Sequence, residues 1–282
     1  LTSFDYNVQS IAFSPDGRRV AVGSRYDRVR LLDLQGQLLR EIEDESRHES
    51  LAFTPDGSEL LIPSRQDYPW GKFDLVRLWQ ADLSTMRLQF PVEGAEVMRS
   101  YTLASVSPDG SFFVLCSRYS NEGPQVFDAR SGELLLTLPD KRGEVNALDI
   151  SPDGNVLAAG FNDGTIEYWQ LERWGAGRFL TPDSTFTLSA HAGRVNSIKF
   201  ADSSRLVSCG ADGQVKVWQL QSGSPKHLGH PASYAVAVSP VNGEIASANA
   251  EGIRILKLAQ EKPESQLGLP SVLDSCIAFS SD

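Results

Sequence analysis

The chain has 282 residues, of which 22% are charged and 41% hydrophobic, a balance ordinary for a soluble globular protein. Its formal net charge of −10 disfavours nucleic acid as a default partner, because phosphate backbones are bound by an excess of Lys and Arg. No apolar run is long enough to span a bilayer, so we expect no membrane partner. The three cysteines (Cys116, Cys209 and Cys276) lie in strand-like runs without metal-ligand spacing, which favours buried thiols in a reducing, cytoplasmic compartment.

One four-residue turn recurs along the chain. Pro presets φ at its second position, Asp hydrogen-bonds its own backbone at the third, and Gly takes a positive φ at the fourth. The four full copies are Ser14-Pro15-Asp16-Gly17, Thr54-Pro55-Asp56-Gly57, Ser107-Pro108-Asp109-Gly110 and Ser151-Pro152-Asp153-Gly154, and weaker copies begin at Ala201, Ser239 and Ser280. The intervals between the seven starts are 40, 53, 44, 50, 38 and 41 residues, which indicates an internal repeat of about forty residues.

Short apolar runs between these turns alternate with a period of two and therefore predict strands. In the first repeat we expect strands at 8–13, 19–23, 29–33 and 37–42. The repeats are expected to span about 5–43, 48–91, 101–139, 144–190, 194–229 and 233–268, with a partial seventh at 274–282. The second repeat carries an insertion at 65–73, and the fourth carries one at 171–183.

A period near forty with this strand-and-turn content is similar to the WD-repeat β-propellers, and seven copies in phase carry the resemblance over essentially the whole chain. The resemblance implies an all-β fold of four-stranded antiparallel blades: six readable blades and the start of a seventh, in a single domain over 1–282. Because the chain starts at Leu1 and ends inside a turn, we expect it to be truncated at both ends. A preceding signal peptide or effector domain is compatible with that expectation.

The fifth repeat matches the family best. The resemblance implies a structural tetrad of hydrogen-bonded side chains in this repeat, formed by His191, Ser208, Asp212 and Trp218. The same Ser, His and Asp also permit a catalytic interpretation, but Ser208 lacks a nucleophile elbow and Trp218 occupies it as a partner. The structural interpretation is therefore preferred.

Other repeats keep only parts of this tetrad. The fourth has Asp163 and Trp169 but Lys141 and Ala159 at the His and Ser positions. The sixth has His230, Ser247 and Glu251 but no Trp. Repeats four and six are therefore expected to depend more on packing.

The chain contains no motif for phosphate binding, for a catalytic metal or for redox chemistry, so we expect no enzyme activity and no cofactor. His227 and His230 could share a metal, but two loop histidines are more often simply solvated, so no metal site is expected.

Arginines at the equivalent position of the first three repeats suggest a partner-binding face. We expect Arg25, Arg65 and Arg118 in an arc, with aromatic residues beside them that favour interfaces. These aromatic residues are Tyr26, Tyr68, Trp70 and Tyr119. Alternatively, the arginines are solvated or pair with neighbours such as Asp27 and Asp67. The insertion at 171–183 holds Trp174 and Phe179 and either covers its own blade or makes a second contact.

These observations predict a non-catalytic interaction scaffold that binds a protein or an acidic peptide, which could be a domain of its own longer chain. Repeated Ser-Pro-Asp-Gly turns resemble bacterial WD-repeat proteins, whose propellers commonly follow a signalling module such as a NACHT-type ATPase, a kinase or a caspase-like protease. One alternative is a propeller hydrolase or lyase with a central polar site. Another is a six-bladed periplasmic propeller, against which Trp79, Trp169 and Trp218 argue.

Overall fold

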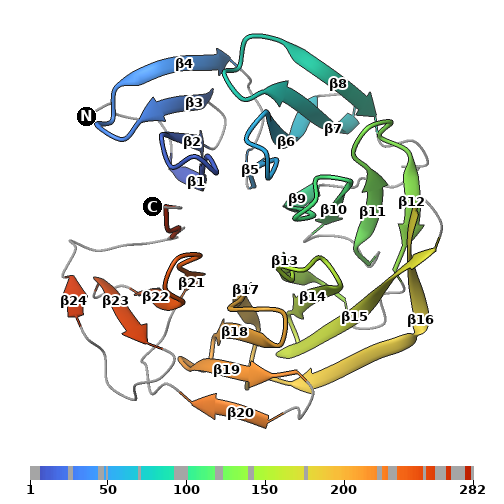
Figure 1. Ribbon diagram of the computed structural model, residues 1–282, viewed down its shortest axis with the longest axis vertical. Coiled ribbons are helices and arrows are strands. Elements are labelled where there is room, and N and C mark those ends of the chain that lie inside the picture. Colours follow the sequence, from blue (N-terminus) through green and yellow to red (C-terminus); the bar gives the residue numbers. More distant parts are fainter. Residues whose placement is uncertain are drawn as a thin grey trace. The chain divides into compact units, whose positions relative to one another are not determined.

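The computed structural model describes residues 7–24, 28–43, 48, 50–68, 71–91, 101–117, 123–138, 143–174, 177–220, 224–227, 234–249, 252–257, 265–267 and 277–280. The regular elements in this part of the chain are all β-strands, arranged as six four-stranded antiparallel sheets (Figure 1). These six sheets are the propeller blades that the repeat predicts. The chain divides into two compact units, each with three blades: 1–137 with 280–282, and 138–279.

The first unit contains blades one to three. Neighbouring blades touch through their inner strands, because β1 contacts β5, and both β5 and β6 contact β9. Blade one consists of β1 (Val8–Phe13), β2 (Arg19–Ser24), β3 (Arg28–Asp33) and β4 (Leu38–Glu43). Blade two consists of β5 (Ala52–Phe53), β6 (Glu59–Tyr68), β7 (Gly71–Gln80) and β8 (Met86–Pro91). Blade three consists of β9 (Tyr101–Val106), β10 (Phe112–Ser117), β11 (Gln125–Asp128) and β12 (Leu134–Thr137).

The second unit contains blades four to six. Strand β17 contacts β13 and β14, and β21 contacts β17 and β18. Blade four consists of β13 (Val145–Ile150), β14 (Val156–Phe161), β15 (Thr165–Trp174) and β16 (Gly177–Ser189). Blade five consists of β17 (Val195–Phe200), β18 (Arg205–Gly210), β19 (Val215–Gln219) and β20 (Ser224–His227). Blade six consists of β21 (Ala235–Val238), β22 (Glu244–Asn249), β23 (Gly252–Lys257) and β24 (Ser265–Leu267).

The start of a seventh blade is not seen. Residues 277–280 carry no strand, and the rest of the expected partial repeat lies outside the described residues. A seventh blade therefore stays a prediction, and so does a single domain over the whole chain.

The repeated turn has the hydrogen bonds that its sequence predicts. In its first copy the Gly17 N–H donates to the Ser14 carbonyl at 2.9 Å, and Gly17 has a φ of 66°. The Ser14 hydroxyl donates to the Asp16 carboxylate at 2.5 Å and accepts from the Arg19 N–H at 2.9 Å. The Ser14 bond is the main cause that lowers the pKa of Asp16. Because the same hydroxyl–carboxylate bond recurs at Thr54, Ser107 and Ser151, each of these turns closes its hairpin in the same way.

The hydrophobic core lies between neighbouring blades. In the second unit one cluster joins Ile166 and Tyr168 of blade four to Leu206 and Trp218 of blade five. In the first unit the inner residues of blade two pack on both sides, Ile62 towards blade one and Leu61 towards blade three. Both faces of blade two are therefore covered by neighbouring blades.

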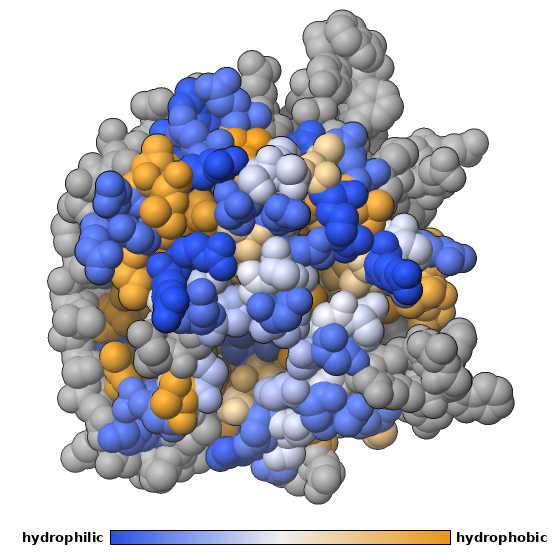
Figure 2. All heavy atoms as spheres, turned by 45° about the horizontal axis from the view of Figure 1, so that its top comes forward, coloured by the Kyte–Doolittle hydropathy of each residue, from blue (hydrophilic) through white to orange (hydrophobic). Residues whose placement is uncertain are grey.

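Exposed large apolar side chains occur mainly on the outermost strands of the first unit and in the turns before them. They include Leu34, Leu38, Leu39, Met86, Leu134 and Leu135. On the face drawn in Figure 2, apolar residues form several separate groups among hydrophilic ones. Scattered exposure of this kind needs no special explanation.

Candidate functional site

The four residues of the expected tetrad form one hydrogen-bonded chain in blade five. Trp218 Nε1 donates to Ser208 Oγ at 2.8 Å. Ser208 Oγ lies 2.8 Å from His191 Nε2, and His191 Nδ1 lies 2.8 Å from Asp212 Oδ1. The chain crosses the blade from β19 through β18 to the segment before β17, so it links three parts of the sheet.

The donors in this chain follow from the chemistry of each group. A carboxylate can only accept, so His191 Nδ1 carries the proton that is shared with Asp212. Nε2 then accepts from the Ser208 hydroxyl, whose oxygen is free to accept from the Trp218 indole. Every polar atom from the indole to the carboxylate thus has a hydrogen-bond partner, as a stable buried position requires.

Asp212 collects further donors. The backbone N–H groups of Gln214 and Ala192 donate to its two oxygens at 3.0 and 3.2 Å. Burial by itself would raise the pKa of Asp212, but the hydrogen bonds from His191, Gln214 and Ala192 outweigh it and lower the pKa to about 2. Lys216 Nζ lies 3.4 Å from Asp212 Oδ2 and donates to the Ala190 carbonyl at 2.6 Å, so a buried cation also ties this carboxylate to the loop before β17.

A nucleophilic role for Ser208 does not fit this geometry. Ser208 is 0% exposed, and its Oγ lies between His191 Nε2 and Trp218 Nε1. A substrate carbonyl would have no path to that oxygen. The Ser, His and Asp of blade five are therefore used to hold the blade together.

Two neighbouring blades keep broken versions of the tetrad. Trp169 pairs in register with Leu157 as Trp218 pairs with Leu206, and Ala159 holds the place of Ser208. Trp169 is 0% exposed, and among the described residues its Nε1 has no hydrogen-bond partner. In blade six, Ser247 Oγ is likewise buried with no partner in the described part of the chain, and Leu256 holds the Trp position. His230 lies outside the described residues.

His48, which was not predicted as a site residue, is also structural. His48 lies four residues before β5, as His191 lies four residues before β17, and this shared spacing is a signal that could have identified it. His48 is fully buried, and its carbonyl accepts a 2.7 Å bond from Ser10 Oγ of blade one. His48 thereby joins blades one and two.

Long side chains that link neighbouring blades were also missed. Arg19 Nη1 donates to the Ala81 carbonyl of blade two at 3.0 Å. Arg87 of blade two pairs with Glu59 and donates to the Ala129 carbonyl of blade three at 2.9 Å. In the second unit, Lys199 Nζ of blade five lies 2.7 Å from the Asp149 carboxylate of blade four. No sequence signal pointed to these pairs, because the acceptors are distant in the chain and two of them are backbone carbonyls.

Most residues of the expected binding face lie outside the described residues: Arg25, Tyr26, Trp70, Arg118 and Tyr119. The other two, Arg65 and Tyr68, belong to β6, because the insertion of blade two extends β6 and β7 as a hairpin. Arg65 is opposite Asp74 in the register, and Tyr68 is opposite Gly71. An oppositely charged register partner of Arg65 was not expected. The arc of arginines stays a prediction.

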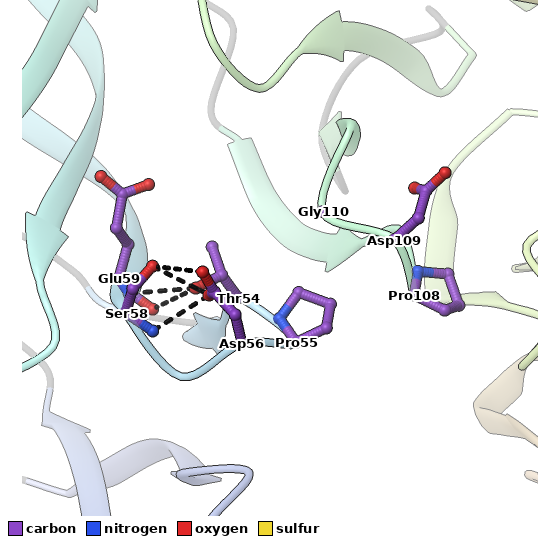
Figure 3. Close-up of a pocket in the computed structure, with 8 residues that line it drawn as sticks. All are labelled: Thr54, Pro55, Asp56, Ser58, Glu59, Pro108, Asp109 and Gly110. Carbon is purple, nitrogen blue, oxygen red and sulfur yellow. Dashed lines mark hydrogen bonds between the residues drawn. The ribbon is translucent and has the colours of Figure 1, made fainter.

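A polar hollow of about 380 Å³ lies between two of the repeated turns in the first unit (Figure 3). Its lining residues are Thr54, Pro55, Asp56, Ser58, Glu59, Pro108, Asp109 and Gly110. Asp56 accepts hydrogen bonds from Thr54 and Ser58 within its own turn, and Glu59 pairs with Arg87. The carboxylates of blade two are therefore engaged in structural bonds.

The comparison with family models identifies the repeats. The model described as "WD domain, G-beta repeat" matches residues 1–33, 132–170 and 182–219. These three segments of the chain are WD repeats. The matched segments include the tetrad of blade five and the incomplete tetrad of blade four, so the WD repeat accounts for both.

Each of several curated relatives matches about a third of the chain. The chain is 38% identical over 88 residues to Restriction of telomere capping protein 1 of Clavispora lusitaniae, a match that covers 31% of this chain and 7% of that protein. It is 34% identical over 89 residues to Protein transport protein SEC31 of Meyerozyma guilliermondii, covering 31% and 7%. It is 29% identical over 89 residues to Protein hir1 of Emericella nidulans, covering 31% and 9%. The chain thus spans less than a tenth of the length of these relatives.

The described residues lack both a membrane-spanning helix and a metal-binding cluster. They contain no helix with the length and apolarity needed to cross a membrane. Nor do they hold any cluster of three or more His, Cys, Asp or Glu that could bind a metal ion. The side chains of the alternative metal ligands His227 and His230 lie outside the described part of the chain.

Proposed function

We propose that this WD-repeat chain is a non-catalytic platform for binding other proteins. The proposal rests on the hydrogen bonds of Ser208. Its side chain is 0% exposed, and its Oγ is bonded to both His191 Nε2 and Trp218 Nε1. Residues that could have supplied hydrolytic chemistry are used for rigidity. WD-repeat proteins generally serve as interaction scaffolds, and a rigid set of blades suits that role.

The proposed binding face consists of Arg25, Arg65 and Arg118 with Tyr26, Tyr68, Trp70 and Tyr119. Guanidinium groups can form paired hydrogen bonds with carboxylates, and aromatic rings add contact area at low entropy cost. The partner is an acidic protein segment, which the chain's net charge of −10 repels elsewhere. Since Asp74 is the register partner of Arg65, we expect Arg65 to contribute less than Arg25 and Arg118.

The test is affinity capture of partners from cell extract, identified by mass spectrometry and then measured with purified proteins. Arg25→Glu combined with Arg118→Glu should abolish capture, while Arg65→Glu alone should weaken it less. Arg194→Glu is the matched control, because Arg194 is an exposed arginine just before an inner strand of blade five. The melting temperature of the Arg25→Glu/Arg118→Glu variant should be unchanged, whereas Arg65→Glu places a second carboxylate opposite Asp74 and should lower the melting temperature slightly. Capture that survives the double substitution would place the partner surface elsewhere.

We also propose that the platform works in the cytoplasm as part of a longer signalling protein. The much greater length of the curated relatives supports this proposal. The full-length reading frame tests it: we expect an adjoining signalling module, and a frame that encodes these repeats alone would refute the proposal.

A further inference from the structure

The turn between β21 and β22 differs from the four full copies of the repeated turn. It is one residue longer, because it reads Ser239-Pro240-Val241-Asn242-Gly243. Its glycine N–H donates to the carbonyl four residues back, from Gly243 to Ser239 at 3.1 Å. Asn242 replaces the aspartate, and its Oδ1 accepts from the Glu244 N–H at 3.0 Å, as the aspartate of the first copy accepts from the N–H two residues ahead. Asn242 thus makes the bond of a turn aspartate with an amide side chain.

The Asn242 side chain lies next to an unshielded main-chain nitrogen. Asn242 is exposed, and the preceding Val241 is 65% exposed. Gly243 has no side chain to cover its nitrogen, and Asn242-Gly243 is the one Asn-Gly pair in the sequence. Because Asn242 bonds the N–H two residues ahead, its amide folds back over the peptide unit that contains the Gly243 nitrogen. The Asn242 Cγ and this nitrogen are therefore held close together.

We propose that Asn242 is a site of spontaneous modification, at which the side-chain amide is lost and the main chain can be rearranged. The Gly243 nitrogen gives its proton to water and attacks the Asn242 Cγ, so that an N–Cγ bond forms, the Cγ–Nδ2 bond breaks and ammonia leaves. Water then opens the resulting succinimide ring. Addition at Cγ gives aspartate, whereas addition at the main-chain carbonyl carbon gives isoaspartate, in which the chain runs through Cβ and Cγ. The whole reaction consumes one water and releases one ammonia, without any redox change.

The turn both assists and gates this attack. Negative charge develops on Oδ1 as the nitrogen adds to Cγ, and the Glu244 N–H already donates to that oxygen at 3.0 Å. The Gly243 N–H, in contrast, must first leave the Ser239 carbonyl. The rate is therefore set by brief openings of an exposed turn, which require no unfolding of the whole chain.

Four other asparagines of the described chain each lack a feature of this site. Asn162 is also exposed, but the side chain of Asp163 shields the next nitrogen. Asn155 is followed by a β-branched residue, which crowds the main chain at that point. Asn146 and Asn249 are buried. Asn162, which shares the exposure without the glycine, is the internal control.

The isoaspartate product should loosen blade six, whereas the aspartate product should not. Isoaspartate adds one carbon atom to the main chain of the turn. The bonds from Gly243 N–H to the Ser239 carbonyl and from Ser239 N–H to the Glu244 carbonyl then cannot both keep their geometry. Blade six lacks a complete tetrad, since Leu256 holds the Trp position and the buried Ser247 Oγ has no partner in the described part of the chain. Aspartate keeps the main chain and the side-chain acceptor.

The first experiment incubates the purified whole chain at neutral pH and physiological temperature and follows each asparagine by peptide mass spectrometry. Asn242 should convert at least about tenfold faster than Asn162, which corresponds to a barrier lower by about 1.4 kcal/mol. The aspartate and isoaspartate peptides have equal mass and are separated by chromatography, and both should take up heavy oxygen from labelled water. Equal or faster conversion of Asn162, or no conversion of Asn242, would overturn the proposed site.

Hydrogen exchange before digestion then measures the effect of each product separately. The peptide that spans β21 and β22 should exchange about fivefold to tenfold faster in the isoaspartate form than in the aspartate form, as expected for the loss of one hydrogen bond, with no change in β17. Asn242→Ser is the matched control, because a hydroxyl can accept the same N–H without carrying an amide. Its exchange should not change during the incubation. Equal exchange of the two products, or equal loosening of the incubated Asn242→Ser chain, contradicts the proposal.

Discussion

Replacing Trp218 with phenylalanine isolates the hydrogen bond at the end of the tetrad. Phenylalanine keeps an aromatic ring at a position that is 3% exposed but removes the Nε1–H that donates to Ser208 Oγ at 2.8 Å. Ser208 then keeps only its bond to His191 in a site from which water is excluded. A buried polar atom that loses a partner costs about 1–3 kcal/mol, and the smaller ring adds a packing loss.

Trp169 provides the matched control in the preceding blade. It occupies the same register position and is also buried, but its Nε1 has no partner among the described residues. Trp169→Phe therefore causes a similar packing loss without breaking a tetrad bond, and it removes a buried N–H that is costly when unpaired. The free energy of unfolding should fall further for Trp218→Phe than for Trp169→Phe, by about 1–3 kcal/mol.

Urea unfolding followed by far-ultraviolet circular dichroism measures both losses without relying on tryptophan fluorescence. The denaturant slope should stay unchanged, so that midpoints report stability. Native-state hydrogen exchange should show faster opening of β18 and β19 in Trp218→Phe. If the two variants lose equal stability, the tetrad bond adds nothing beyond packing, and our account of blade five is wrong.

Three further predictions concern pH, backbone space and thiol reactivity. The pKa of Asp212 is about 2 in the folded chain against an ordinary 3.8, so its contribution is present above about pH 4 and is lost as pH falls towards 2. An acid titration of stability should show a loss of roughly 2 kcal/mol that Asp212→Asn removes. Gly164→Ala should destabilise by about 3 kcal/mol or more, because its Cβ would lie 2.1 Å from the His191 carbonyl oxygen. Gly143→Ala, also at positive φ but with nothing within 4 Å, should cost only about 1–2 kcal/mol in the same urea assay. Burial raises the pKa of Cys209 to about 12, so maleimide should label it only after unfolding, as followed by peptide mass spectrometry.

The parts of the fold that depend on local chemistry could be predicted from the sequence. Pro, Asp and Gly each have one role in the repeated turn, so the turn at Ser14 and the strands beside it were placed to within one residue. The tetrad partners could be named because the family resemblance gives their order in the repeat. Their distances required the structure.

The rest depends on non-local pairing. The sequence marks residues 65–73 as an insertion, but their mixed aromatic and charged composition does not show whether they form a loop or extend the flanking strands. The structure makes them strand residues, and only the register reveals that Arg65 is opposite Asp74 while Arg173 is opposite Arg178. The buried position of His48 and the acceptors of Arg19 and Arg87 also depend on neighbouring blades.

The arginine links of the first unit have a consequence for how such repeats diverge. Arg19 and Arg87 each donate to a main-chain carbonyl of the following blade, Ala81 and Ala129. A carbonyl is offered by every amino acid, so the receiving turn can change its side chain without losing the link. A salt bridge such as Lys199–Asp149, in contrast, requires both residues to be retained together. Hydrogen bonds from arginine to a main-chain carbonyl therefore let adjacent repeats diverge in sequence, lengthen their hairpins and acquire new surfaces while the blades stay attached.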